Sequence, residues 1–203
     1  MDLAGVDVSR ETIDRLREYE SLVHKWNPSI NLVSKGDLAH LWRRHFTDSI
    51  QLAGLVEEYP PNWLDIGSGG GFPGLVVAAL ASELSPETKF TLVESDQRKC
   101  VFLRTVIRTL NLNCTVISSR IENCAAQSAN SISARALAPL NELFGYSERH
   151  LRTGGRMYFP KGQNHADEIH LAQKNWTFDI VAHDSLTDNT AKIIEAWNLE
   201  RIK

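Results

Sequence analysis

The sequence lacks the features that define several large classes of protein. No apolar run approaches the roughly 20 residues of a membrane-spanning helix. Asp2 and Asp7 stand where a secretory signal would have a basic and then an apolar segment. The three cysteines, Cys100, Cys114 and Cys124, form no Cys-x-x-Cys pair, which disfavours a disulfide framework and a zinc site. We therefore expect a cytoplasmic protein with reduced cysteines and no membrane contact. A monomer is also expected.

Metal and polyanion binding are disfavoured as well. His40 and His45, like His165 and His170, are five residues apart, whereas ligands on one helical face are separated by three or four. No bound metal is expected. The formal net charge of −3 argues against binding a nucleic acid through bulk charge, because such proteins are usually basic overall or on one face. Any contact with RNA is expected to be local.

The length fits one well-cored unit. With 203 residues and 42% hydrophobic content, we expect a single domain over residues 1–203, made of a helical extension at 1–60 and a sheet core at 61–203.

The extension shows helical periodicity. Apolar residues at successive spacings of three, three, three, one and three, from Ile13 to Trp26, predict a helix from a cap near Ser9 to a stop at Pro28. A second helical segment, about 38–56, would bring Arg44 and Asp48, four residues apart, into a surface ion pair.

Glycines cluster in the stretch Asp65-Ile66-Gly67-Ser68-Gly69-Gly70-Gly71-Phe72-Pro73-Gly74. A short apolar run precedes this stretch, and residues 75–84 follow it without a helix breaker. The pattern predicts a strand, a tight turn and a buried helix, which is the start of a βαβ unit. Glycine suits such a turn because the backbone takes positive φ values and because a Cβ would keep a ligand away.

The spacing of the glycines indicates the class of ligand. Dinucleotide-binding turns use G-x-G-x-x-G, but Gly67, Gly69 and Gly71 are two residues apart and Phe72 occupies the place of the last glycine. Asp65 precedes the first glycine by two residues. This arrangement resembles the D/E-x-G-x-G-x-G pattern of methyltransferases that use S-adenosylmethionine (AdoMet). A glycine turn without a ligand is the alternative.

A second β-rich run, residues 89–94, ends in an acid. In nucleotide-binding folds an acid at this position accepts hydrogen bonds from both ribose hydroxyls. Glu94 fits that role, and a solvated carboxylate is the alternative.

Further strands are expected at 115–117, 131–134 and 156–159, with helices at 97–110 and 140–151, a turn at Gly154-Gly155, and a final pair of strands at 177–181 and from Lys192 onward. The result is an α/β fold with a doubly wound, mostly parallel, seven-stranded sheet. Because parallel strands end at one rim, Glu94, Arg135 and Lys161 are expected there together, where open sheets bind ligands.

The helix at 97–110 is basic. It carries four cations and no acid, namely Arg98, Lys99, Arg104 and Arg108. Its basic residues indicate either an RNA-facing patch or a solvated amphipathic face.

Several motifs occur in the order found in one family of bacterial enzymes. They are Trp26-Asn27, Asn31-Leu32-Val33-Ser34, Arg44-His45-x-x-Asp48-Ser49, the glycine stretch 65–74, Arg120-x-Glu122, Ala134-Arg135-Ala136 and Lys161-Gly162. Together they resemble the RsmG (GidB) family of methyltransferases, which act on guanine N7 of small-subunit ribosomal RNA. The resemblance covers about residues 19–162, and the last forty residues match only loosely.

The resemblance implies a Rossmann-like enzyme that uses AdoMet to methylate guanine N7 in 16S rRNA, free or within the 30S subunit. It implies cofactor contacts at Gly67, Phe72, Ile121, Glu122 and Arg135, to which the turn and strand patterns add Gly69, Gly71 and Glu94. The RNA contacts expected are Arg44, Arg98, Lys99, Arg135 and Lys161, and the residues expected to position the substrate are His45, Arg135 and Lys161. No side chain is expected to act as a general base. The alternatives are a methyltransferase acting on a small molecule or protein, and a ribosome-assembly module that binds AdoMet without turnover.

Overall fold

The computed structural model describes residues 2–203. Its elements, in chain order, are β1 (Asp2–Leu3), β2 (Val6–Asp7), α1 (Arg10–Ile30), α2 (Lys35–Leu38), a π-helical turn (Trp42–Thr47), α3 (Asp48–Ala53), β3 (Asn62–Ile66), α4 (Gly74–Leu84), β4 (Lys89–Glu94), α5 (Gln97–Leu110), β5 (Cys114–Ser118), a 3₁₀ turn (Ile121–Asn123), β6 (Ala129–Ser133), α6 (Leu140–His150), β7 (Leu151–Lys161), α7 (His165–Ala172), β8 (Trp176–Asp184) and β9 (Lys192–Arg201).

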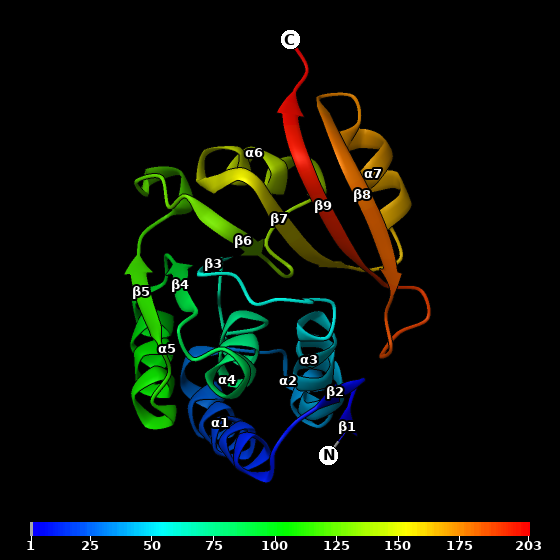
Figure 1. Cartoon of the computed structure of the whole chain (residues 1–203). Helices are drawn as coiled ribbons and strands as arrows, with labels where there is room; N and C mark the ends of the chain where they lie inside the picture. The colour runs from blue at the N-terminus through cyan, green and yellow to red at the C-terminus, as the bar shows by residue number, and fades with distance from the viewer. Residues whose placement is uncertain (1) are drawn as a thin grey trace.

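A seven-stranded sheet organises the chain, with the strand order β5-β4-β3-β6-β7-β9-β8 (Figure 1). The first five strands in this order are parallel, and β9 is antiparallel to both β7 and β8. The predicted doubly wound, mostly parallel sheet is confirmed. The chain leaves β3 toward β5 and returns to β6 on the other side of β3, so a topological switch point lies between β3 and β6. Ligands bind outside the carboxyl ends of strands at such a point.

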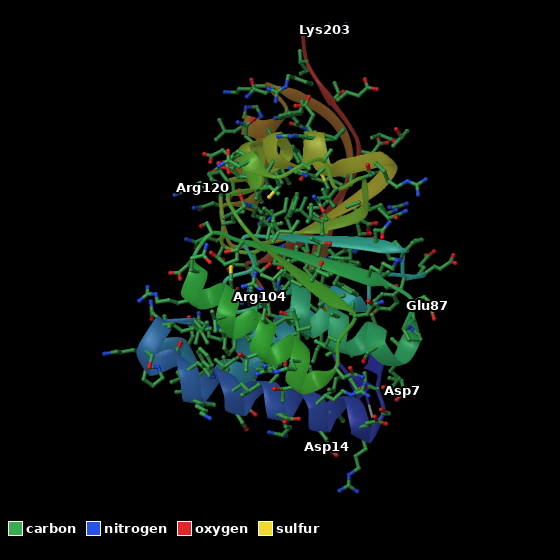
Figure 2. The ribbon with its side chains drawn as sticks, turned by 90° about the vertical axis from the view of Figure 1, so that its left-hand side faces the viewer. Asp7, Asp14, Glu87, Arg104, Arg120 and Lys203 are labelled. Atoms are coloured by element: carbon green, nitrogen blue, oxygen red, sulfur yellow. The ribbon has the colours of Figure 1, made fainter. Side chains whose placement is uncertain are left out.

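Helices cover both faces of the sheet. In Figure 1, α1, α4 and α5 lie on one side and α6 and α7 on the other, and Figure 2 shows the sheet between these layers, with α1 outermost. Residues 74–81 of α4 are all buried, because this helix lies between the sheet and α1. A helix that is apolar all round, as predicted for this segment, fits such a position.

The N-terminal segment begins with a short hairpin, β1 and β2, which the helical periodicity did not predict. The Ser9 cap is confirmed, because its hydroxyl accepts the Thr12 amide at 3.1 Å. The predicted stop at Pro28 is wrong by two residues. Although Pro28 has no N–H to donate, the helix continues to Ile30, and the Asn31 amide closes the last turn on the Asn27 carbonyl at 3.0 Å.

The predicted helix at 38–56 is divided. Its middle is the π-helical turn Trp42–Thr47, which is followed directly by α3. A π-turn inserts a residue and rotates the side chains that follow it. The expected ion pair between Arg44 and Asp48 is therefore wrong, since Arg44 pairs with Asp37 and Asp48 pairs with Arg135.

The C-terminal third contains two departures from expectation. Gly154 and Gly155 lie within the long strand β7 rather than in a turn before it, at an irregularity in the β6–β7 register where Gly154 has φ +73°. Helix α7 was not predicted. The final antiparallel pair is present as β8 and β9. Within residues 2–203, no helix has the length and apolarity needed to cross a bilayer.

Candidate functional site

Two cavities open at the carboxyl-end rim of the sheet. The smaller, about 420 Å³, lies over the glycine stretch and is called the turn cavity here. The larger, about 1380 Å³, is lined by residues drawn from four segments, 37–48, 135–139, 160–168 and 185–193, and is called the cleft. Both cavities share four residues at their junction: His45, Arg135, Ala136 and Leu137. Figure 2 labels Arg120, which lines the turn cavity, and Glu87, which precedes β4 at the opposite rim.

The glycine turn has the backbone conformation that its sequence predicts. Gly67, Gly69 and Gly71 have φ values of +66°, +55° and +90°. Gly69 lines the turn cavity, and a Cβ added there would meet nothing nearer than the Gly67 carbonyl oxygen at 3.8 Å. A Cβ on Gly71 would lie 2.3 Å from the Tyr19 hydroxyl. Gly71 is not among the residues that line the turn cavity, and its lack of a side chain leaves room for Tyr19 and Leu75. Its expected cofactor contact stays a prediction.

Tyr19 of α1 supports this turn from behind. Its ring is fully buried and stacks on Phe72 with centroids 5.3 Å apart, and its hydroxyl donates a hydrogen bond to the Gly70 carbonyl oxygen. Burial raises the pKa of the hydroxyl well above its ordinary value, so it remains a donor. The helical extension is thereby joined directly to the turn.

Glu94 ends β4 beside the turn and is 8% exposed. One carboxylate oxygen, Oε2, accepts the Gly69 amide at 2.8 Å, and Oε1 accepts the Asp96 amide at 2.7 Å. A carboxylate oxygen can accept more than one hydrogen bond. The carboxylate is therefore fixed by the backbone and still able to accept from hydroxyl groups of a ligand in the turn cavity.

The far wall of the turn cavity comes from the segment after β5. Ser119, Arg120, Ile121 and Glu122 line it. Ile121 is 6% exposed, and the carbonyl oxygen of Glu122 accepts a hydrogen bond from Arg149 at 3.1 Å. The predicted contacts Ile121 and Glu122 thus face the same space as Glu94.

A buried polar chain supports the strand ends beneath the turn. Trp63 Nε1 donates to Ser133 Oγ at 2.9 Å, and Ser133 Oγ donates to Asp65 Oδ1 at 2.6 Å. Asp65 is 1% exposed, its Oδ2 has no hydrogen-bond partner, and burial raises its pKa to about 6. A Cβ on Gly74 would lie 2.6 Å from the carboxyl carbon, so glycine at that position allows α4 to begin directly against Asp65.

Arg135 occupies the junction between the two cavities. Its guanidinium donates to the Arg44 carbonyl oxygen and to Asp48 Oδ2, both at 3.1 Å, and its Nη2 contacts His45 Nδ1. The same group lies 5.2 Å from the centre of the Phe72 ring. Burial and the adjacent Arg135 charge lower the pKa of His45 to about 4. His45 is therefore neutral at physiological pH, with Nδ1 free to accept from Arg135.

Lys161 ends β7 at the cleft and is more enclosed than an RNA contact requires. Its side chain is 9% exposed, and its ammonium group pairs with Glu168 and donates to the Ala138 carbonyl oxygen, both at 2.7 Å. Glu168 also accepts the Leu140 amide at 2.7 Å. Lys161 thus holds the segment that leads from the junction into α6, and its expected roles in positioning the substrate and contacting RNA stay predictions.

The remaining predicted RNA contacts separate into different places. Arg44 lines the cleft, with its side chain 61% exposed. Lys99 lines the turn cavity instead, and Arg98 lines neither cavity and pairs with Asp96 at 3.3 Å. Arg43, which was not singled out from the sequence, also lines the cleft. Among residues 2–203, no cluster of three or more His, Cys, Asp or Glu side chains is arranged to hold a metal ion.

Three contributions to the site have no clear signal in the sequence. In the sequence, Tyr19 is only one of several apolar positions of a predicted helix. Leu137 follows the Ala134-Arg135-Ala136 motif, and a sequence gives no indication that it stays exposed. Thr187 in the β8–β9 loop donates to Asp48 Oδ1 at 3.1 Å across 139 residues of chain, a contact that only the fold could reveal.

Comparisons with known proteins identify the family and the fold. A family model described as GidB, rRNA small subunit methyltransferase G, matches residues 12–195. The ribosomal RNA small subunit methyltransferase G of Cereibacter sphaeroides is 49% identical over 94% of this chain and 92% of its own length. The protein of the same name from Ruegeria pomeroyi is 48% identical over 99% and 98%. The crystal structure of M. jannaschii TYW2 in complex with AdoMet has the same fold, with a TM-score of 0.58 at 11% identity over 84% of this chain and 78% of its own.

Proposed function

The chain belongs to the rRNA small subunit methyltransferase G family, and from this premise we propose that it transfers a methyl group from AdoMet to N7 of a guanine in 16S rRNA. The observation that carries the proposal is the meeting of a cavity of cofactor size with an arginine-lined cleft at four shared residues. A methyl donor in the turn cavity and a base in the cleft would come together only there.

The turn cavity suits AdoMet. Its volume of about 420 Å³ lies within the range of roughly 300–1,000 Å³ typical of small-molecule sites. The backbone of residues 67–70 would hold the methionine portion, Glu94 would accept the ribose hydroxyls, and Ile121 and Glu122 would flank the adenine. When bound, AdoMet supplies a sulfonium-activated methyl group, and the protein has to aim it toward the cleft.

The cleft suits contact with a short stretch of RNA rather than binding along an extended basic surface. Arg43 and Arg44 line it beside several carboxylates, including Asp37, Asp48 and Asp188. Because the protein has a net charge of −3, binding would depend on a few phosphate contacts and on shape. We propose a cytoplasmic monomer whose substrate is 16S rRNA, either free or within the 30S subunit.

The chemistry at N7 needs positioning more than proton transfer. Guanine N7 has an in-plane lone pair and no proton, so its attack on a methyl group requires no general base. Holding the reacting atoms in line can supply about 7 to 11 kcal/mol of the barrier. The product carries a new positive charge on the imidazole ring, and the Arg135 charge beside it is already balanced by Asp48. His45 is neutral and holds Arg135 rather than taking up a proton.

A transfer assay with methyl-labelled AdoMet tests the proposal. Naked 16S rRNA, assembled 30S subunits, a protein mixture and a small-molecule panel would be offered separately to the enzyme. Label in RNA is expected from one or both ribosomal substrates. Label only in protein or small molecules would contradict the rRNA assignment, and AdoMet binding without transfer to any of them would indicate a module that does not turn over.

A further inference from the structure

An exposed apolar side chain stands at the junction of the turn cavity and the cleft. Leu137 lines both cavities and is 40% exposed. Tyr146 apart, the other large apolar side chains that line the turn cavity are at most 9% exposed. They are Leu32, Ile66, Phe72, Val93 and Ile121. We propose that Leu137 is the surface against which the target guanine packs after it leaves the RNA stack, an inference that rests on the proposed function.

The backbone around Leu137 is fixed from both sides. Before it, Arg135 is held by Asp48, His45 and the Arg44 carbonyl oxygen. After it, the Ala138 carbonyl oxygen accepts from Lys161 at 2.7 Å, and the Leu140 amide donates to Glu168. An exposed side chain on such a segment is a defined surface rather than the end of a loose loop.

Ala136 gives a second sign that the position of Leu137 is imposed. Its φ is +53°, a left-handed conformation that costs a non-glycine residue free energy and persists only where the surroundings enforce it. Such residues cluster at functional sites. Here the strained residue directly precedes the exposed leucine and lines the same junction.

One side of Leu137 is already supported. A Cβ added to Gly67 would lie 2.6 Å from Leu137 Cδ1, so the leucine packs directly on the first glycine of the turn. Its exposed side is therefore the one available to a ligand. A base packed there would be next to the turn cavity, where the methyl donor is expected.

The chemistry of the reaction favours an apolar support at this place. Enzymes that act on a base remove it from the stack and hold it between apolar or aromatic side chains, and every base has a face that can pack in this way. Methylation at N7 also leaves a positive charge on the ring. A leucine can hold that ring without repelling the product, whereas an additional cation could not.

This role separates base placement from RNA affinity. Contacts to phosphates dominate the affinity of RNA-binding proteins and position the nucleic acid, and under the proposed function Arg43 and Arg44 of the cleft are placed to make such contacts. Loss of Leu137 should therefore reduce the rate of the bound complex and leave RNA affinity nearly unchanged.

The test compares Leu137→Ala and Leu137→Gln with the volume-conserving Leu137→Met. Leu171→Ala is the matched control, because Leu171 is 52% exposed on α7 and lines neither cavity. In single-turnover methylation at saturating AdoMet, Leu137→Ala and Leu137→Gln should lose roughly 10- to 100-fold in rate, the size of loss expected when a reacting group is misplaced. Leu137→Met should stay within about threefold, and Leu171→Ala should match wild type. The dissociation constants for RNA and AdoMet should change by less than about twofold.

A fluorescence measurement distinguishes base placement from a general structural effect. RNA carrying 2-aminopurine at the methylated position should brighten when wild-type enzyme binds, as the base leaves the stack, and should brighten much less with Leu137→Ala. Equal brightening and equal methylation rates in these two enzymes would overturn the role of Leu137. A matching loss of AdoMet affinity would also overturn it, by making Leu137 a cofactor contact. Absence of RNA methylation by the wild-type enzyme would instead overturn the proposed function.

Discussion

Two glycines of the same turn should respond differently to substitution by alanine. Gly69 and Gly71 both have positive φ, so an alanine at either position carries the left-handed backbone cost of about 1–2 kcal/mol. Their surroundings differ. The new methyl group at Gly69 would enter the turn cavity with no atom nearer than 3.8 Å, whereas at Gly71 it would meet the Tyr19 hydroxyl at 2.3 Å and Leu75 Cδ1 at 2.6 Å.

The magnitudes follow from these distances. Overpacking of this kind costs about 1–3 kcal/mol, and displacing Tyr19 would break its bond to the Gly70 carbonyl oxygen, leaving a buried donor at a cost of about 1–3 kcal/mol. Gly71→Ala should therefore lose roughly 3 kcal/mol or more of the free energy of unfolding, and Gly69→Ala about 1–2 kcal/mol. Gly69→Ala should in addition lose about tenfold or more in AdoMet affinity, because its methyl group occupies ligand space.

Chemical denaturation of both ligand-free variants measures the first difference, and calorimetric titration with AdoMet measures the second. Wild-type AdoMet affinity in Gly69→Ala would show that the cofactor does not approach this backbone. Equal stability of the two variants would refute the packing of Tyr19 against Gly71.

Three further predictions concern pH, charge and the C-terminal loop. The single-turnover rate should be nearly constant from about pH 6 to 9, and His45→Ala should lose activity only modestly. The reason is that the pKa of His45 is lowered to about 4, so its imidazole is neutral throughout this range. An ionisation of the wild-type enzyme in this range that the mutation removes would show that His45 acts as a base. Replacing Arg98 and Lys99 together with glutamine should flatten the salt dependence of RNA binding by about one to two units if each meets a phosphate, and an unchanged slope would assign both to solvent. Thr187→Val should slow methylation severalfold, because it removes one of the hydrogen bonds that fix Asp48, the partner of Arg135. Thr187→Ser should keep the wild-type rate, and a wild-type rate in Thr187→Val would show that the β8–β9 loop does not contribute to the site.

The sheet core was predictable because its signals are local. The run that ends at Glu94 and the helix that follows it match β4 and α5 residue for residue, since each has its own apolar periodicity and Asp96 caps the helix. The π-helical turn at 42–47 was not predictable, because its hydrogen bonds depend on where Phe46 and His45 pack rather than on local propensity. The irregularity at Gly154 was misassigned for a related reason, as a glycine pair in a strand and in a turn look alike in a sequence.

The residues of the candidate site that could be predicted are those whose type and position in a motif indicate one role. The glycine turn and Glu94 lie together at the turn cavity, as their motif and strand-end positions indicated. The cations were harder to place, because a sequence does not show which carboxylate each one meets. Lys161 pairs with Glu168 and Arg98 with Asp96, whereas Arg43, which no motif marked, lines the cleft.

The identity of the methylated nucleoside tests the central claim most directly. Ribosomal RNA labelled by the enzyme with methyl-labelled AdoMet would be digested to nucleosides and separated by chromatography with mass detection. Transfer by positioning, without a base, predicts label in 7-methylguanosine. Label in a guanosine methylated on its exocyclic amine, or on a ribose hydroxyl, would require removal of a proton and would contradict the account of the junction between the turn cavity and the cleft.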